Sequence, residues 1–138
     1  MMKSSFIRRA LSIILSVLTF CGLASCNDGG SELVGYEQIS QAEAKRLMDT
    51  EKDYIIIDAR TQSEFDEGHI PGAILIPEYE IAERAEKELP NKDQLILVYC
   101  RSGRRSKIAA QALADLGYTN VKEFGGIITW EYDIVTEE

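Results

Sequence analysis

The chain has 138 residues, with 15 lysines and arginines against 23 aspartates and glutamates, and a formal net charge of −8 at pH 7. This length is enough for one domain with a modest core. A chain this acidic repels phosphate groups, so we do not expect nucleic acid among its partners.

Residues 1–25 have the pattern of a secretory signal peptide. A basic start is followed by residues 10–24, which are almost wholly apolar and carry no charge. This segment is shorter than the roughly 20 residues that a membrane-spanning helix needs. Its end, Leu23–Cys26, resembles a bacterial lipobox, which implies cleavage before Cys26 and a lipid on that cysteine. The alternative is an N-terminal anchor that is never cleaved, and both interpretations place the domain outside the cytoplasm.

Cleavage would make Cys100 the only unmodified thiol of the chain. Cys21 would leave with the signal peptide, and Cys26 would carry the lipid. A disulfide between Cys26 and Cys100 is the structural alternative, but it would consume the lipobox residue. We therefore expect an exported protein, lipid-anchored to a bacterial membrane and facing the periplasm or the cell exterior. Its free thiol needs a functional explanation.

Residues 26–35 are rich in glycine and polar residues and are expected to form a flexible tether. Residues 36–138 follow as one domain without an internal repeat or boundary. Capping-box patterns at Ser40–Glu43 and Thr61–Glu64 mark two helix starts. Short apolar runs alternate with helical patterns along this domain, which predicts an α/β fold with a parallel sheet and helices on both faces.

The expected strands are residues 36–39, 54–57, 74–76, 95–99 and 121–124. Helices are expected at residues 41–49, 61–66, 78–89 and 127–132, and from the loop after Cys100 to about residue 116. Two of the strands, 54–57 and 95–99, are apolar throughout, which is typical of strands covered on both faces. In the helix after Cys100 the side chains expected to face the core are Ile108, Ala109, Ala112, Leu113 and Leu116.

Cys100 stands where a buried strand meets a loop and a helix start. The amide groups and the dipole of a helix N-terminus favour a thiolate. Gly103 is the position at which the loop would need a positive φ or a close approach of two backbones. The alternative is a structural buried cysteine, which needs neither the glycine nor the neighbouring cations. The residues predicted to bind an anionic substrate, through amides and guanidinium groups, are Arg101, Ser102, Gly103, Arg104, Arg105 and Ser106.

Asp58 and Arg60 follow another predicted strand, and the carboxyl ends of parallel strands form ligand sites. The two residues either border the pocket or form an ion pair that fixes the strand end. We favour the ion pair, because an acid beside Cys100 would raise the thiol pKa. His69, the only histidine, lies in a turn, where we expect it to support the site rather than act as a general base. Trp130 is expected to fill the core.

These motifs together resemble a single-domain rhodanese, a member of a sulfurtransferase family. The first family motif is matched by Ile57–Thr61, Glu64-Phe65 and Gly68–Ala73, the active-site loop by Cys100–Ser106, and the closing motif by Gly125-Gly126 with Trp130. The resemblance implies a three-layer sandwich with a five-stranded parallel sheet. It also implies that the cysteine takes a sulfane sulfur from a donor such as thiosulfate, holds it as a persulfide and passes it to cyanide or a thiol. In this pattern the histidine helps to hold the loop.

The expected partners are therefore a small anionic sulfur donor and a thiol or cyanide-like acceptor, with no cofactor, no metal, and membrane contact only through the lipid. A cysteine-dependent phosphatase or arsenate reductase is disfavoured, because Ser106 stands where its oxyanion-binding arginine would be, counted from Cys100. The loop is one residue shorter and suits one sulfur atom better than a phosphate. A non-catalytic sulfur-carrier or binding module is a further alternative. A thiol redox protein would need an external resolving thiol.

Overall fold

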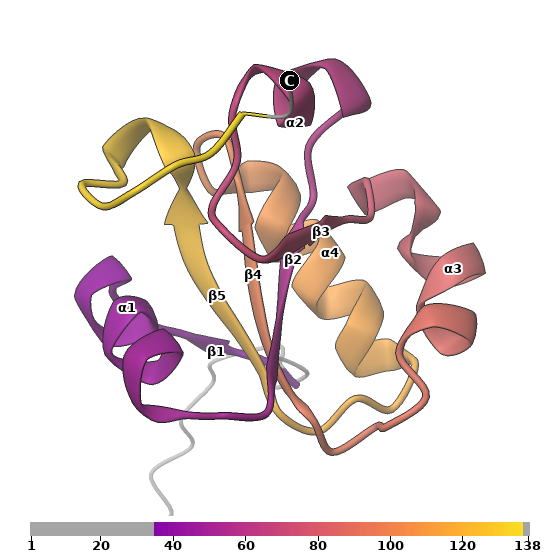
Figure 1. Cartoon of the computed structure of the whole chain (residues 1–138). Helices are drawn as coiled ribbons and strands as arrows, with labels where there is room; N and C mark the ends of the chain where they lie inside the picture. Colours follow the sequence, from indigo (N-terminus) through magenta and orange to yellow (C-terminus); the bar gives the residue numbers. More distant parts are fainter. Residues whose placement is uncertain (1–34, 137–138) are drawn as a thin grey trace, which may run out of the picture. The chain divides into compact units, whose positions relative to one another are not determined.

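The computed structural model of this chain describes residues 35–136, so the predicted signal peptide, Cys26 and almost all of the tether lie outside the described residues. Within that range a five-stranded sheet, all of whose paired strands run parallel, has the order β1-β5-β4-β2-β3 (Figure 1). The strands are β1 Glu37–Gln38, β2 Tyr54–Asp58, β3 Ala73–Leu75, β4 Leu95–Cys100 and β5 Val121–Gly126. The predicted parallel α/β sheet is confirmed.

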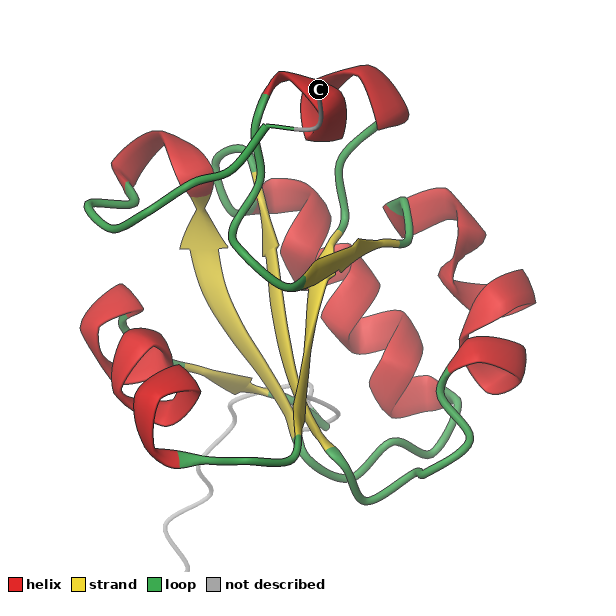
Figure 2. Cartoon of the chain, viewed as in Figure 1, coloured by secondary structure: helices red, strands yellow, loops and turns green. Residues whose placement is uncertain are grey.

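Helices cover both faces of this sheet (Figure 2). Helix α1 lies against one face, α3 and α4 lie against the other, and α2 lies beyond the carboxyl ends of the strands (Figure 1). The helices are α1 Gln41–Thr50, α2 Gln62–Glu67, α3 Ile81–Glu88 and α4 Arg104–Asp115, with 3-10 turns η1 Glu78–Glu80 and η2 Ile127–Thr129. The arrangement is the expected three-layer sandwich.

Strand β4 explains why the core has two halves. All of its residues are buried, and their side chains alternate between the two faces of the sheet. Ile96, Val98 and Cys100 pack with α3 and α4, whereas Leu97 and Tyr99 pack with α1. Burying each large apolar side chain of this strand stabilises the fold by roughly 1.5–3 kcal/mol, so β4 is its central support.

Both predicted capping boxes start a helix, but only one is complete. The Thr61 hydroxyl accepts a hydrogen bond from the Glu64 amide, and the Glu64 carboxylate accepts one from the Thr61 amide. At α1 the Ser40 hydroxyl accepts from the amide of Glu43. The Glu43 side chain, however, turns along the helix to Arg46 instead of returning to Ser40. An N-cap of this kind is worth about 1 kcal/mol to its helix.

Three details of the predicted elements are wrong. The stretch 78–89 is not one helix, because Glu78–Glu80 form a 3-10 turn and the α-helix begins only at Ile81, with Glu80 as its N-cap at φ −104° and ψ −6°. The last helix ends at Thr129, and Trp130 is extended so that its ring packs against Phe124, with ring centres 5.5 Å apart. Ile108 is 51% exposed, since the buried stripe of α4 is Ser106, Ala109, Ala110 and Leu113.

Candidate active site

Cys100 ends β4 with its side chain on the face covered by α4, and the residue is 1% exposed. The chain then turns through Arg101 and Ser102 to Gly103, which caps α4 with φ +99°. This left-handed conformation favours glycine and directs the Gly103 amide at the thiol, with 3.0 Å between N and Sγ. The predicted arrangement of a cysteine at a helix start is therefore present.

The surroundings of Cys100 act on its pKa in two directions. Burial, the largest single influence, would raise the pKa of the thiol, because it disfavours the charged form. A hydrogen bond from the Ser106 hydroxyl, wherever that hydroxyl turns to the sulfur, and the amides of Ser106, Gly103 and Ser102 act against it. These donors prevail and hold the pKa of Cys100 below its usual value, which increases the thiolate fraction at neutral pH.

Strand β5 holds the loop from the other side, which explains the paired glycines of the sequence. The carbonyl of Arg101 accepts a hydrogen bond of 3.2 Å from the amide of Ile128. Gly126 lies so close to this carbonyl that a Cβ on it would stand 2.0 Å from the oxygen. No side chain fits there, so Gly126 is required for the position of the loop.

The three loop arginines have different surroundings. Arg105 forms a forked ion pair with Glu64 of α2, with two N–O distances of 2.7 Å. Its guanidinium, with help from Thr61, lowers the pKa of Glu64 to about 2. Arg101 and Arg104 are exposed, and neither forms an ion pair within residues 35–136. These two guanidinium groups are therefore the ones available to an anion approaching from solvent.

Asp58 and Arg60 form the ion pair that we favoured. Asp58 is 0% exposed, and its carboxylate accepts hydrogen bonds from the Arg60 side chain at 2.7–3.0 Å and from the Tyr99 hydroxyl at 2.6 Å. Arg60 also donates to the carbonyl of Gly68. Because Tyr99 points away from the face of Cys100, this cluster fixes the ends of β2 and β4 and does not touch the sulfur.

His69 is buried and held on three sides. Its ring stacks on Phe65 with ring centres 3.7 Å apart, and its Nδ1 lies 3.0 Å from the Phe65 carbonyl oxygen. Its backbone pairs with Val135 through two hydrogen bonds of 2.8 Å. These contacts account for the histidine as a support of the turn between α2 and β3.

Comparison with known proteins agrees with this geometry. The sequence profile described as "Rhodanese-like domain" matches residues 40–132. The chain belongs to the rhodanese-like family. The thiosulfate sulfurtransferase PspE of Escherichia coli is 39% identical over 71 residues, which are 51% of this chain and 68% of that protein.

Other relatives of this rhodanese-like domain differ in length. A rhodanese-related protein of Thermoplasma volcanium superposes with a TM-score of 0.64 at 32% identity, over 74% of this chain and 100% of that one. The adenylyltransferase and sulfurtransferase UBA4 of Candida albicans is 32% identical in an alignment 123 residues long that covers 84% of this chain. The chain spans only 27% of the length of UBA4. These relatives place the chain in a sulfurtransferase family.

Sequence reasoning missed two acidic side chains of the rhodanese site. The pattern at Thr61–Glu64 predicts a capping box for Glu64 but not its contact with Arg105, and no motif of the sequence marks Glu123. Glu123 is 3% exposed and accepts hydrogen bonds from Ser106 at 2.6 Å and from the amide of Gly125 at 2.8 Å. A signal was present, because Val121 and Glu123 share one face of a strand, and a glutamate on a buried face needs partners.

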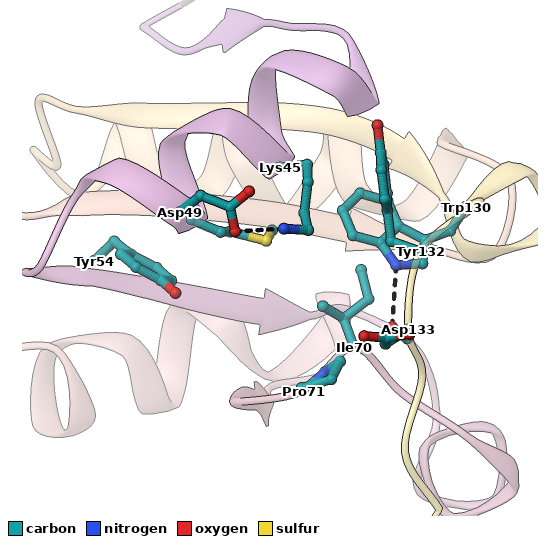
Figure 3. Close-up of a pocket in the computed structure, with 9 residues that line it drawn as sticks. Lys45, Asp49, Tyr54, Ile70, Pro71, Trp130, Tyr132 and Asp133 are labelled. Carbon is teal, nitrogen blue, oxygen red and sulfur yellow. Dashed lines mark hydrogen bonds and ion pairs between the residues drawn. The ribbon is translucent and has the colours of Figure 1, made fainter.

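A cavity of about 220 Å³ lies on the opposite side of the sheet, between α1 and the segments before β3 and after β5 (Figure 3). Trp130, Tyr132 and Ile70 line it. Among its polar groups, Lys45 pairs with Asp49 and the Trp130 ring donates to the Asp133 carbonyl. It contains none of the predicted site residues.

In residues 35–136 no group of three or more histidine, cysteine, aspartate or glutamate side chains is placed to hold a metal ion. No helix of that part of the chain is long and apolar enough to cross a membrane.

Proposed function

We propose that Cys100 carries a sulfane sulfur as a persulfide, taking it from an anionic donor such as thiosulfate and passing it to a thiol or cyanide-like acceptor. The observation that carries this proposal is the Gly103 amide aimed at a buried Sγ at 3.0 Å, at the start of α4. Membership of a sulfurtransferase family supports it. So does a relative that is named a thiosulfate sulfurtransferase.

The chemistry takes two displacements at sulfur. The Cys100 thiolate attacks the outer sulfur of thiosulfate, a new S–S bond forms, and sulfite leaves with the electron pair of the old one. The acceptor then attacks the outer sulfur of the persulfide, and Cys100 leaves as a thiolate. The loop amides that favour the thiolate would also stabilise the negative charge of the persulfide, so both steps use the same donors.

The arginines of the loop have two roles in this proposal: some bind the anionic donor, and one positions the start of α4. Arg101 and Arg104 are exposed and suited to the sulfonate oxygens of a donor, since guanidinium forks match such groups. Arg105 is engaged by Glu64, so it positions the start of α4. The positive loop would attract a small anion to an otherwise acidic molecule.

The surroundings of Ser106 argue against the phosphatase alternative. Its hydroxyl donates to the carboxylate of Glu123 at the position where a phosphatase would present an arginine. A phosphate dianion there would meet a buried carboxylate instead of a guanidinium, which is unfavourable.

The test uses the purified full-length protein with thiosulfate and cyanide. We expect thiocyanate to form and the Cys100→Ser variant to form none. The same samples receive an aryl phosphate. Phosphate release that depends on Cys100, without thiocyanate, would replace this proposal with the phosphatase. No transfer from thiosulfate, polysulfide or glutathione persulfide would leave only a non-catalytic module.

We further propose that the chain is exported and lipid-anchored through Cys26 to a bacterial membrane, with the domain facing the periplasm or the cell exterior. The support is the lipobox-like Leu23–Cys26 after a charge-free apolar segment. Labelled palmitate fed to cells should enter the full-length protein and not a Cys26→Ala variant. Equal labelling of both proteins would contradict the anchor.

A further inference from the structure

Glu123 is a buried acid beside the reactive loop. It pairs with Val98 in the sheet, so its side chain lies on the face covered by α4. One of its oxygens, Oε1, accepts hydrogen bonds from the Ser106 hydroxyl at 2.6 Å and from the Gly125 amide at 2.8 Å. No lysine or arginine within residues 35–136 forms an ion pair with it. A carboxylate in such a place needs its hydrogen bonds.

The Ser106 hydroxyl lies 2.6 Å from Oε1 of Glu123 and 3.1 Å from the carbonyl oxygen of Gly103. A hydrogen bond from the same hydroxyl to Cys100 would lower the pKa of the thiol. A hydroxyl has one proton, so it donates to one of them at a time. The distance of 2.6 Å to Oε1 is that of a strong hydrogen bond to an ionised acceptor.

We propose that Glu123 is a positioning residue that tunes the nucleophile: it holds the Ser106 proton and places its own negative charge one side chain away from Cys100. The thiolate is then left to the backbone amides of the loop. This inference rests on the proposed role of Cys100 as the sulfur-accepting nucleophile and adds to it the group that sets its basicity.

The consequence is a balance between two properties of Cys100, the fraction of it that is thiolate and the nucleophilicity of that thiolate. A thiolate with a very low pKa is plentiful but a weak nucleophile, and nucleophilicity rises with basicity. Glu123 opposes the amides and keeps the thiolate more reactive toward the donor. Other charged groups around the loop remain unchanged when Glu123 is altered. Arg105 of α4 interacts with the charge of Cys100 and is itself coupled to Glu64 of α2 and Glu78 of η1, and Lys107 of α4 lies near Gly103 and Glu123.

The experiment measures alkylation of Cys100 by iodoacetamide as a function of pH, in the full-length protein. The tryptic peptide 93–101 contains only this cysteine, so mass spectrometry separates it from Cys21 and Cys26. Glu123→Gln retains a carbonyl oxygen for the Gly125 amide and removes the charge. We expect the midpoint of the profile to fall by about one pH unit. Alkylation should then be about threefold faster at acidic pH and about threefold slower on the alkaline plateau.

A second variant tests whether the Ser106 hydroxyl donates its hydrogen bond to Glu123 or to the Cys100 thiolate. If the Ser106 hydroxyl donates to Glu123, Ser106→Ala should leave the midpoint nearly where it is in the wild type. If the hydroxyl donates to the thiolate instead, this variant raises the midpoint by about one pH unit and the inference is overturned. Ser106→Ala retains a small side chain in the helix, so it remains informative should the Glu123 variant fail to fold.

The matched control is Glu83→Gln, which removes the same charge from an exposed position of α3 and should leave the profile unchanged. If the alkylation profile of Glu123→Gln overlays that of the wild type, the proposal is overturned, and Glu123 only holds the loop in place. Because alkylation needs no sulfur donor, this outcome is separate from a failure of sulfur transfer itself.

Discussion

Two buried polar clusters lie at the ends of neighbouring strands and differ in how their charges are compensated. At the end of β2, Asp58 is paired with Arg60 and accepts a hydrogen bond from the Tyr99 hydroxyl. Near the end of β4, the Gly103 amide contacts Cys100, and the Ser106 hydroxyl and the Gly125 amide contact Glu123. Within residues 35–136 neither Cys100 nor Glu123 forms an ion pair with a lysine or arginine.

The difference separates stability from reactivity. The carboxylate and guanidinium of the first cluster cancel each other, and removal of one would leave the other buried and unpaired. In the proposed function the second cluster would keep a thiolate reactive, because dipoles rather than a fixed ion pair stabilise it. Substitutions in the two clusters should therefore fail in different ways.

The largest expected effect is that of Cys100→Ser. We expect sulfur transfer to vanish, because a serine hydroxyl is not ionised at neutral pH and cannot form a persulfide. The unfolding free energy should fall by no more than about 1–3 kcal/mol, because the shape is nearly kept and the buried hydroxyl can still accept from the Gly103 amide. Transfer assays and urea denaturation check the two statements. Residual transfer in this variant would assign the chemistry to another group.

Asp58→Asn should show the opposite behaviour. It leaves the Arg60 guanidinium buried without a carboxylate and should lower the unfolding free energy by about 3–5 kcal/mol. The molecules that remain folded should still be alkylated at Cys100. Glu43→Gln, in the exposed ion pair with Arg46, is the control and should change stability far less. If both variants have equal stability, the buried pair is not the support described here.

Gly103→Ala should moderately affect both the stability of the fold and the reactivity of Cys100. An alanine at φ +99° costs about 1–2 kcal/mol and would tilt the amide away from Sγ. We expect lower stability and a higher midpoint in the alkylation profile of Cys100. Gly117→Ala is the matched control, because Gly117 has φ +91° but follows α4 at its other end. It should lose similar stability and leave the thiol unchanged.

The smallest expected effect is on the pH dependence of stability, through the ion pair of Glu64 with Arg105. Arg105 lowers the pKa of Glu64 to about 2 in the folded protein, against an ordinary value near 4.5. The ion pair therefore contributes fully above about pH 4.5, and its contribution is lost as the pH falls toward 2. This contribution is about 1 kcal/mol or less, since the pair is partly exposed. Glu64→Gln should flatten this part of a stability profile measured between pH 5 and 2, and a parallel profile would contradict the assignment.

Regular features of the sequence predicted most of the fold. Apolar runs located β2 and β4, and the two N-cap residues located α1 and α2, because these patterns act through local backbone and burial. The Asp58–Arg60 pair was foreseeable for the same reason, since it spans neighbouring positions at one strand end. The predicted strands agree with the structure to within two residues at their ends.

What could not be predicted depends on contacts across the fold. The ion pair of Arg105 with Glu64 joins α4 to α2, and no pattern along the chain specifies it. Ile108 was placed inward because an apolar stripe on a helix can be drawn in more than one direction. Only packing against the sheet decides that Ala109 and Leu113 face inward and Ile108 does not.

The most direct test of the central claim is the mass of the tryptic peptide 93–101 after the full-length protein meets thiosulfate. The account predicts an increase by one sulfur atom on Cys100, reversed by cyanide. An unmodified peptide 93–101 in a protein that still transfers sulfur would contradict it.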